Sequence, residues 1–175
     1  MNPKILLVDD EPATLESYED ILSDHGFDTR RALSHEEAIV ALETEGPWDV
    51  ILLDEMLRGS GGSAMATSVL ADIAARAPTA RTIVITGFAT PDLVRTALRA
   101  GAWDYLEKDA RYLELLLPVR VRHAVEAARE RSLRGVATGV IAAELQGAWA
   151  AARAPGLDAP RKGRLLEETA LLLFR

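Results

Sequence analysis

Cysteine is missing altogether from the 175-residue sequence. Its absence excludes disulfide bonds, thiolate metal sites and cysteine nucleophiles, and it suits a reducing cytoplasm, where we expect the protein to reside. Long apolar runs are missing too, because none approaches the roughly 20 residues that a helix needs to span a bilayer. The N-terminus enters a strand-like run and does not resemble a secretory signal. We therefore expect no membrane segment.

Positive charge is in deficit, with 20 lysine and arginine residues against 27 acids and a net charge of -7. This balance argues against a nucleic-acid surface over the whole chain. The C-terminal region contains no recognisable helix-turn-helix with a basic recognition helix, so we expect no nucleic-acid binding within this chain. The hydrophobic content of 49% and the charged content of 27% are typical of a globular protein. The length allows one full domain and an additional segment.

Short apolar runs alternate with segments of helical period. The apolar runs cover residues 5–8, 50–53, 82–85 and 103–106, with a weaker one at 27–32. The helical segments cover 12–23, 35–44, 63–76 and 91–100. This alternation predicts an α/β fold with a mostly parallel sheet and helices on both faces. The runs at 5–8, 50–53 and 82–85 are continuously apolar, as expected of strands buried on both sides. We predict a doubly wound, flavodoxin-like sheet of five parallel strands in the order 2-1-3-4-5.

The C-terminal third predicts further helix. Residues 112–134 indicate a fifth helix, with Pro118 in its first turn or at a kink and Gly135 at its end. An alanine-rich segment follows over 136–154, and residues 154–160 have the composition of a linker. We therefore divide the chain into a domain over 1–132 and a helical extension over 133–175, the extension being an expected start of a truncated output domain.

Polar side chains stand where the apolar strands end. Asp9 and Asp10 follow the first strand, Asp54 ends the third, Thr86 ends the fourth and Lys108 follows the fifth. Parallel sheets of this class place such ends at one edge, where ligands bind. Carboxylates without thiols or suitably placed histidines form a hard oxygen site for Mg²⁺ or Mn²⁺. A carboxylate beside such a metal can be a nucleophile toward phosphorus, with an ammonium neutralising the developing charge.

This ordered set resembles the bacterial two-component response-regulator receiver domain (CheY-like), over roughly residues 1–130. The family pattern is an acid pair after the first strand, a phosphoacceptor aspartate after the third, a threonine or serine after the fourth and a lysine after the fifth. The matching residues here are Asp9 with Asp10, Asp54, Thr86 and Lys108.

The resemblance also implies roles for single residues. Asp10 and Asp54 would bind Mg²⁺ directly, Asp9 would act mainly through water, and the backbone carbonyl of Met56 would complete the protein ligands. Tyr105, three residues before the lysine, matches the aromatic switch residue of the family. Gly62 matches a glycine eight residues after the phosphoacceptor. Glu55 is expected at the surface.

The function that the resemblance implies is phosphoacceptance and not enzymatic turnover. A sensor histidine kinase or a phosphotransfer protein would phosphorylate Asp54 with Mg²⁺, and the domain would catalyse its own phosphorylation and a slow autodephosphorylation. Phosphorylation would switch the face formed by the helix over 91–100, the strand over 103–106 and the helix after it. A homodimer through this face, or through the extended fifth helix, is a further expectation.

Several positions depart from the family pattern. Arg58 and Asp109 occupy places where receivers often carry proline. The first makes the loop at 58–62 more flexible, and the second predicts a trans peptide bond after Lys108. Met56 and Phe88, two residues after Asp54 and Thr86, are both apolar and unable to orient an attacking water, which predicts slow autodephosphorylation.

Two alternatives stay open. A pseudo-receiver would have the same fold and bind partners without phosphoryl transfer, and a phosphatase of the aspartate-nucleophile type would also use a strand-end aspartate with Mg²⁺. The phosphatases resemble an Asp-x-Asp pattern after the first strand, which this sequence lacks. The last 15 residues faintly resemble the opening helix of restriction-endonuclease-like domains, without any catalytic residue of that class.

Overall fold

The structure, a computed structural model, describes residues 2–59 and 62–152. The chain forms two compact units, Met1–Glu130 and Arg131–Arg175. Within the described residues, no helix is both long enough and apolar enough to cross a membrane. The predicted linker at 154–160 and the segment with a resemblance to restriction endonucleases lie outside the described residues.

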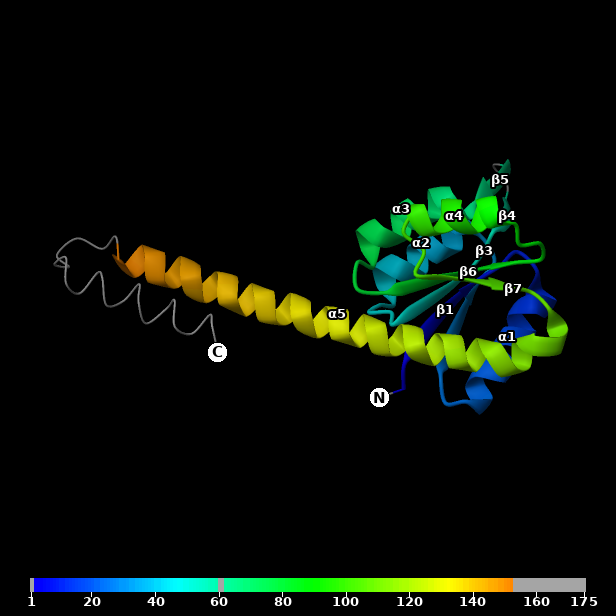
Figure 1. The fold of residues 1–175 in the computed structure, drawn as a ribbon, viewed down its shortest axis with the longest axis horizontal. Coiled ribbons are helices and arrows are strands. Elements are labelled where there is room, and N and C mark those ends of the chain that lie inside the picture. The colour runs from blue at the N-terminus through cyan, green and yellow to red at the C-terminus, as the bar shows by residue number, and fades with distance from the viewer. Residues whose placement is uncertain (1, 60–61, 153–175) are drawn as a thin grey trace. The chain divides into compact units, whose positions relative to one another are not determined.

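The first unit contains a five-stranded parallel sheet (Figure 1). Its strands are β1 (Lys4–Val8), β2 (Asp28–Ala32), β3 (Val50–Asp54), β6 (Arg81–Thr86) and β7 (Asp104–Glu107). They lie in the order β2-β1-β3-β6-β7, in which β6 and β7 are the fourth and fifth strands of the sheet. The predicted order 2-1-3-4-5 and the doubly wound α/β class are therefore confirmed.

Helices α1 (Pro12–Asp24), α2 (His35–Thr44), α3 (Ala66–Arg76), α4 (Pro91–Arg99) and α5 (Ala110–Ala152) connect or follow the strands. Local sequence explains where two of them begin. The Ser34 hydroxyl accepts a hydrogen bond from the Glu37 amide, and the Thr90 hydroxyl accepts one from the Leu93 amide. Each cap satisfies an amide that the first helical turn would otherwise leave unpaired.

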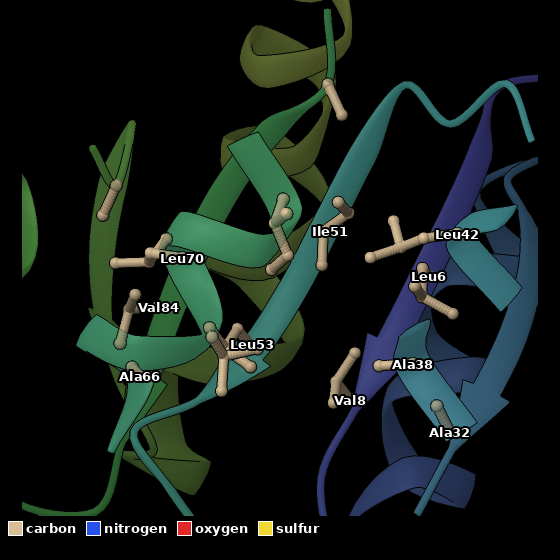
Figure 2. Packing of buried hydrophobic residues seen from close by; sticks show 14 of the residues in the cluster. Leu6, Val8, Ala32, Ala38, Leu42, Ile51, Leu53, Ala66, Leu70 and Val84 are labelled. Atoms are coloured by element: carbon tan, nitrogen blue, oxygen red, sulfur yellow. The ribbon is translucent and has the colours of Figure 1, made fainter. Parts of the chain in front are cut away.

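Two hydrophobic clusters cover the two faces of the sheet. Alternate residues of a strand point to opposite faces, so Leu6 and Val8 join one cluster while Ile5 and Leu7 join the other. Figure 2 shows the first cluster, in which side chains of β1, β3 and β6 meet those of α2 and α3. The second cluster packs against α1 and the early part of α5. Burial on both faces holds the strand ends in fixed positions at the edge of the sheet.

The segment after Asp54 differs from the prediction. Residues 58–62 were expected to form a flexible loop and residues 63–76 a helix, but β4 (Met56–Gly59) and β5 (Gly62–Met65) pair as an antiparallel hairpin. Because the hairpin uses the backbone groups of 62–65 in its ladder, α3 cannot begin before Ala66. The Ala66 amide donates to the Glu55 carbonyl at 2.9 Å, so the two ends of the hairpin lie close together.

The end and the start of the fifth helix also differ from the prediction. Helix α5 continues through Gly135 to Ala152, and it begins early enough that Pro118 lies inside it and not in its first turn. An interior glycine costs a helix only about 1 kcal/mol relative to alanine, so a single glycine among good helix formers does not end one. The predicted end at Gly135 was wrong for this reason.

Candidate functional site

An ammonium group joins two carboxylates at the carboxyl edge of the sheet. The Lys108 Nζ atom lies 2.7 Å from Oδ2 of Asp9 and 2.8 Å from Oδ1 of Asp54. The exposed fractions of the side chains are 22% for Lys108, 2% for Asp9 and 11% for Asp54, so these ion pairs are largely shielded from water. The structure thus brings together three of the predicted site residues from three different strand ends.

Asp10 completes an acidic cluster beside this lysine. One carboxylate oxygen from each of Asp9, Asp10 and Asp54 lies within 4.8 Å of the others. The Glu11 amide donates to Asp9 Oδ1 at 2.9 Å and fixes the orientation of that carboxylate. Within the described residues, the cluster contains only carboxylates, and such a set of hard oxygen donors fits Mg²⁺ or Mn²⁺ and not Zn²⁺.

Burial and charge act in opposite directions on these groups. Burial raises the pKa of Asp54 above its usual value, and the hydrogen bond from Lys108 only partly opposes this shift. Burial alone would lower the pKa of Lys108, but the hydrogen bonds to Asp54 and Asp9 outweigh it and raise the pKa. Burial also raises the pKa of Tyr18 on α1, against the opposing charge of Lys108. Lys108 is therefore a permanent cation, and the carboxylates depend on it or on a metal for their charge balance.

Thr86 is buried, and its hydroxyl is hydrogen-bonded to Glu55 and Phe88 and not to the acid cluster. Its exposed fraction is 4%, its hydroxyl accepts from the Phe88 amide at 3.2 Å, and it donates to a carboxylate oxygen of Glu55. Glu55 was expected at the surface, but it is half-buried and its carboxylate is paired with Thr86. The pairing follows from the strand register in the structure, in which Asp54 lies opposite Ile85 and the next pair along is Glu55 and Thr86, so the sequence alone gives no signal for it.

Tyr105 is half-buried and packs against the hydrophobic cluster of Figure 2. Its hydroxyl is buried beside the side chains of Thr86 and Glu55. Burial raises the pKa of Tyr105, the Thr86 hydroxyl opposes the shift and the charge of Glu55 adds to it, so these two groups are electrostatic neighbours of the phenol. The predicted switch aromatic therefore lies beside the predicted switch threonine.

Met56 and Phe88 flank the site and face solvent. Their exposed fractions are 52% and 74%, and both line the same hollow as the acid cluster. The Met56 amide donates to Asp54 Oδ2 at 3.1 Å, which places its backbone at the cluster, while its carbonyl as a metal ligand stays a prediction. Gly62 pairs with Gly59 in the hairpin. Among the described residues only the Gly46–Pro47 bond is cis, so the bond after Lys108 is trans, as predicted.

Comparison with known proteins gives one consistent family. The family model described as "Response regulator receiver domain" matches residues 5–120. The alginate biosynthesis transcriptional regulatory protein AlgB of Pseudomonas aeruginosa is 35% identical over 105 residues, which are 60% of this chain and 22% of AlgB. A putative NtrX-like response regulator of Rickettsia bellii is 34% identical over 104 residues, 59% of this chain and 21% of the relative. The chain thus spans about a fifth of the length of these relatives.

Solved structures agree with the sequence comparison. A CheY-like receiver domain protein from Methanospirillum hungatei is 27% identical, with a TM-score of 0.63 over 74% of this chain and 99% of that one. The structure of NtrX from Brucella abortus in complex with ADP is 30% identical, with a TM-score of 0.63 over 75% of this chain and 30% of NtrX.

Proposed function

The chain belongs to the response regulator receiver domain family, and from this premise we propose that it accepts a phosphoryl group on Asp54 in two-component signalling. The family is a signalling phosphoacceptor and not a classical enzyme. The observation that carries the proposal is the Lys108 ammonium, which bridges Asp9 and Asp54 beside a cluster of three carboxylates. A nucleophilic carboxylate and a cation for the developing charge thus lie within hydrogen-bonding distance of each other.

We assign the metal site to Asp9, Asp10 and Asp54, with the Met56 backbone carbonyl as a further ligand. The three carboxylates fit Mg²⁺ or Mn²⁺ by donor type and by their mutual distances. A bound Mg²⁺ supplies positive charge that lets an anionic phosphodonor approach an anionic nucleophile. In this assignment Asp9 and Asp10 hold the cation, and Asp54 is the nucleophile.

The transfer step is a displacement at phosphorus. A carboxylate oxygen of Asp54 attacks the phosphorus of a phosphohistidine on a sensor kinase or phosphotransfer protein. The new P–O bond forms as the P–N bond breaks, and the imidazole leaves with the bonding electron pair. Lys108 neutralises charge on the phosphoryl oxygens, and Thr86 donates its hydroxyl proton to one of them. Self-catalysed phosphorylation by acetyl phosphate is the same displacement at phosphorus, except that a P–O bond breaks and acetate leaves.

A beryllofluoride experiment separates this function from the two alternatives. With Mg²⁺ present, beryllofluoride is expected to form a phosphoryl-like adduct on Asp54, which NMR shift mapping or a crystal structure would locate. An adduct on Asp9 would favour a phosphatase. No adduct would favour a pseudo-receiver.

The apolar positions beside the site support slow loss of the phosphoryl group. Neither Met56 nor Phe88 can orient an attacking water, and both stand at the mouth of the site. Replacing Phe88 with glutamate is expected to speed dephosphorylation by about tenfold, because the carboxylate could orient the attacking water. This factor is smaller than the full effect of general base catalysis. The measurement is the decay of phosphorylated protein after removal of the donor. Phe27→Leu, a change in an aromatic residue away from the site, is the control, and equal decay rates for wild type and Phe88→Glu would contradict the interpretation.

We further propose that phosphorylation switches the face formed by α4, β7 and α5, and that this face or the extension of α5 contacts a second copy. Exposed apolar side chains on α4 and on early α5 support a contact surface; they are Leu98, Leu115, Leu116 and Val119.

We also propose that the receiver ends at residue 132 and that the extension begins at residue 133. The boundary between the two compact units, which lies after Glu130, supports this division. A cytoplasmic location stays a prediction.

A further inference from the structure

The Thr86 hydroxyl donates its proton to Glu55 and not toward the acid cluster. A hydroxyl has a single proton to donate. The proposed phosphoryl chemistry needs that same proton for an oxygen of phosphorylated Asp54. The acceptor that occupies it is a carboxylate, and hydrogen bonds to ionised acceptors are roughly twice as strong as neutral ones. The donor that the phosphoryl group requires is thus already engaged.

The fold fixes this arrangement through the faces of the sheet. The cluster of Figure 2 contains Leu53 and Val84, and side chains of α3 and α4 belong to it, so these two residues point to the face that α3 and α4 cover. Tyr105 packs against the same cluster. Strand alternation places Glu55 and Thr86, each two residues further along, toward this same face. Leu7, Leu52 and Leu106 belong to the opposite cluster, and the next residues on their face are Asp9, Asp54 and Lys108. Glu55 and the phosphorylation site therefore approach Thr86 from different faces.

The backbone of Glu55 is also held in place. Its amide donates to the Ile85 carbonyl at 2.9 Å, and its carbonyl accepts from the Ala66 amide at 2.9 Å. These bonds tie Glu55 to β6 and to the start of α3 at the base of the β4–β5 hairpin. The carboxylate is thus a fixed part of the site and not a mobile surface group.

We propose that Glu55 is a positioning residue that competes with the phosphoryl group for the Thr86 hydroxyl and so stabilises the unphosphorylated state. The inference rests on the proposed function and extends it to a residue outside the family pattern. Phosphorylation of Asp54 redirects the hydrogen bond of the Thr86 hydroxyl to a phosphoryl oxygen, and Glu55 loses its donor. The hydroxyl can donate to Glu55 or to the phosphoryl group but not to both, so the hydrogen bond to one acceptor weakens the hydrogen bond to the other.

The competition has a consequence for Tyr105. Its hydroxyl is buried, and Glu55 and Thr86 are its polar neighbours. Once Thr86 turns to the phosphoryl group, the Glu55 carboxylate is left without that donor, and the Tyr105 hydroxyl can replace it. Glu55 thereby links the state of Thr86 to the position of the Tyr105 ring.

The test compares the affinity of Glu55 variants for beryllofluoride in saturating Mg²⁺. Glu55→Ala removes the competing acceptor and is expected to bind about tenfold tighter than wild type, the effect of losing one hydrogen bond to a charged group. Glu55→Gln retains a neutral acceptor and is expected to gain only about threefold. Glu107 is exposed and lies opposite Thr86 on β7. Glu107→Gln is therefore the matched control, because it removes one nearby negative charge without removing the acceptor of the Thr86 hydroxyl. This control is expected to bind like wild type.

A double-mutant cycle with Thr86→Val separates competition from a change in the electrostatic field. In the Thr86→Val background, Glu55→Ala is expected to have no further effect on affinity, because no hydroxyl proton remains to be shared. Equal affinities for Glu55→Gln and Glu55→Ala, or an undiminished effect of Glu55→Ala beside Thr86→Val, would overturn the proposal. Failure of wild type to bind beryllofluoride at all would refute the proposed function, and the competition with it.

Discussion

Asp54→Ala is expected to abolish labelling of the protein by acetyl phosphate in the presence of Mg²⁺. The variant removes the carboxylate that lies 2.8 Å from the Lys108 ammonium and that supplies one arm of the acidic cluster. Without a nucleophilic oxygen at this position no acyl phosphate can form there, so the labelling rate should fall by at least about a thousandfold. The measurement is the phosphorylated fraction over time, by intact mass or phosphate-affinity electrophoresis.

The controls distinguish loss of the acceptor from loss of the fold. Asp92→Ala changes an exposed carboxylate on α4 that pairs with Arg95, and it should be labelled like wild type. Cooperative unfolding of Asp54→Ala in urea would show that the variant is folded. Unchanged labelling of Asp54→Ala would refute the central claim, and a label transferred to Asp9 or Asp10 would show that the nucleophile had been misassigned.

The arrangement of the acid cluster was predictable from the sequence because its positions depend on strongly specified strands. Residues 5–8, 50–53 and 83–85 are continuously apolar, which fixes them as buried parallel strands. The residue that follows such a strand lies at the carboxyl edge of the sheet, because parallel strands all end at the same edge. Asp9 and Asp54 therefore meet at this edge as the sequence predicts, and β7, which pairs with β6, brings Lys108 beside them.

The role of Glu55 was not predictable in the same way. Its partner depends on the register between β3 and β6, in which Asp54 lies opposite Ile85. These strands are neighbours in the sheet but far apart in the sequence, and a one-residue shift between them would give Glu55 a different partner. An isolated glutamate after a strand is most often a solvated side chain. Its hydrogen bond to Thr86 becomes visible only when both strands are placed.

Weak local signals explain the two errors in secondary structure. The β4–β5 hairpin is short and rich in glycine, and it has neither the apolar alternation of a strand nor the period of a helix. The predicted end of α5 depended on one glycine, whose cost of about 1 kcal/mol the neighbouring helix formers offset. Both segments lie where tertiary contacts or neighbouring residues outweigh the propensity of single positions.

Lys108→Met is expected to destabilise the metal-free protein and to make its stability depend strongly on Mg²⁺. Lys108 is the cation that balances Asp9 and Asp54, and these carboxylates are only 2% and 11% exposed. Removing one partner of a buried ion pair leaves uncompensated charge, so the free energy of unfolding in EDTA should fall by about 3 kcal/mol. The comparison is urea unfolding of wild type and variant in EDTA. Arg30→Met, which breaks an exposed pair with Glu45, is the matched control and should cost less than about 1 kcal/mol.

Addition of Mg²⁺ gives the sharper part of this experiment. In wild type the metal must compete with the Lys108 ammonium for the same carboxylates. In Lys108→Met that ammonium is missing, so the metal meets no such competition. A ligand that binds only the folded state stabilises it in proportion to the logarithm of its concentration over Kd. Mg²⁺ should therefore raise the unfolding free energy of Lys108→Met by more than that of wild type, and recover much of the loss seen in EDTA. Equal stabilisation of the two proteins would show that the ammonium and the metal do not share the carboxylates of Asp9 and Asp54.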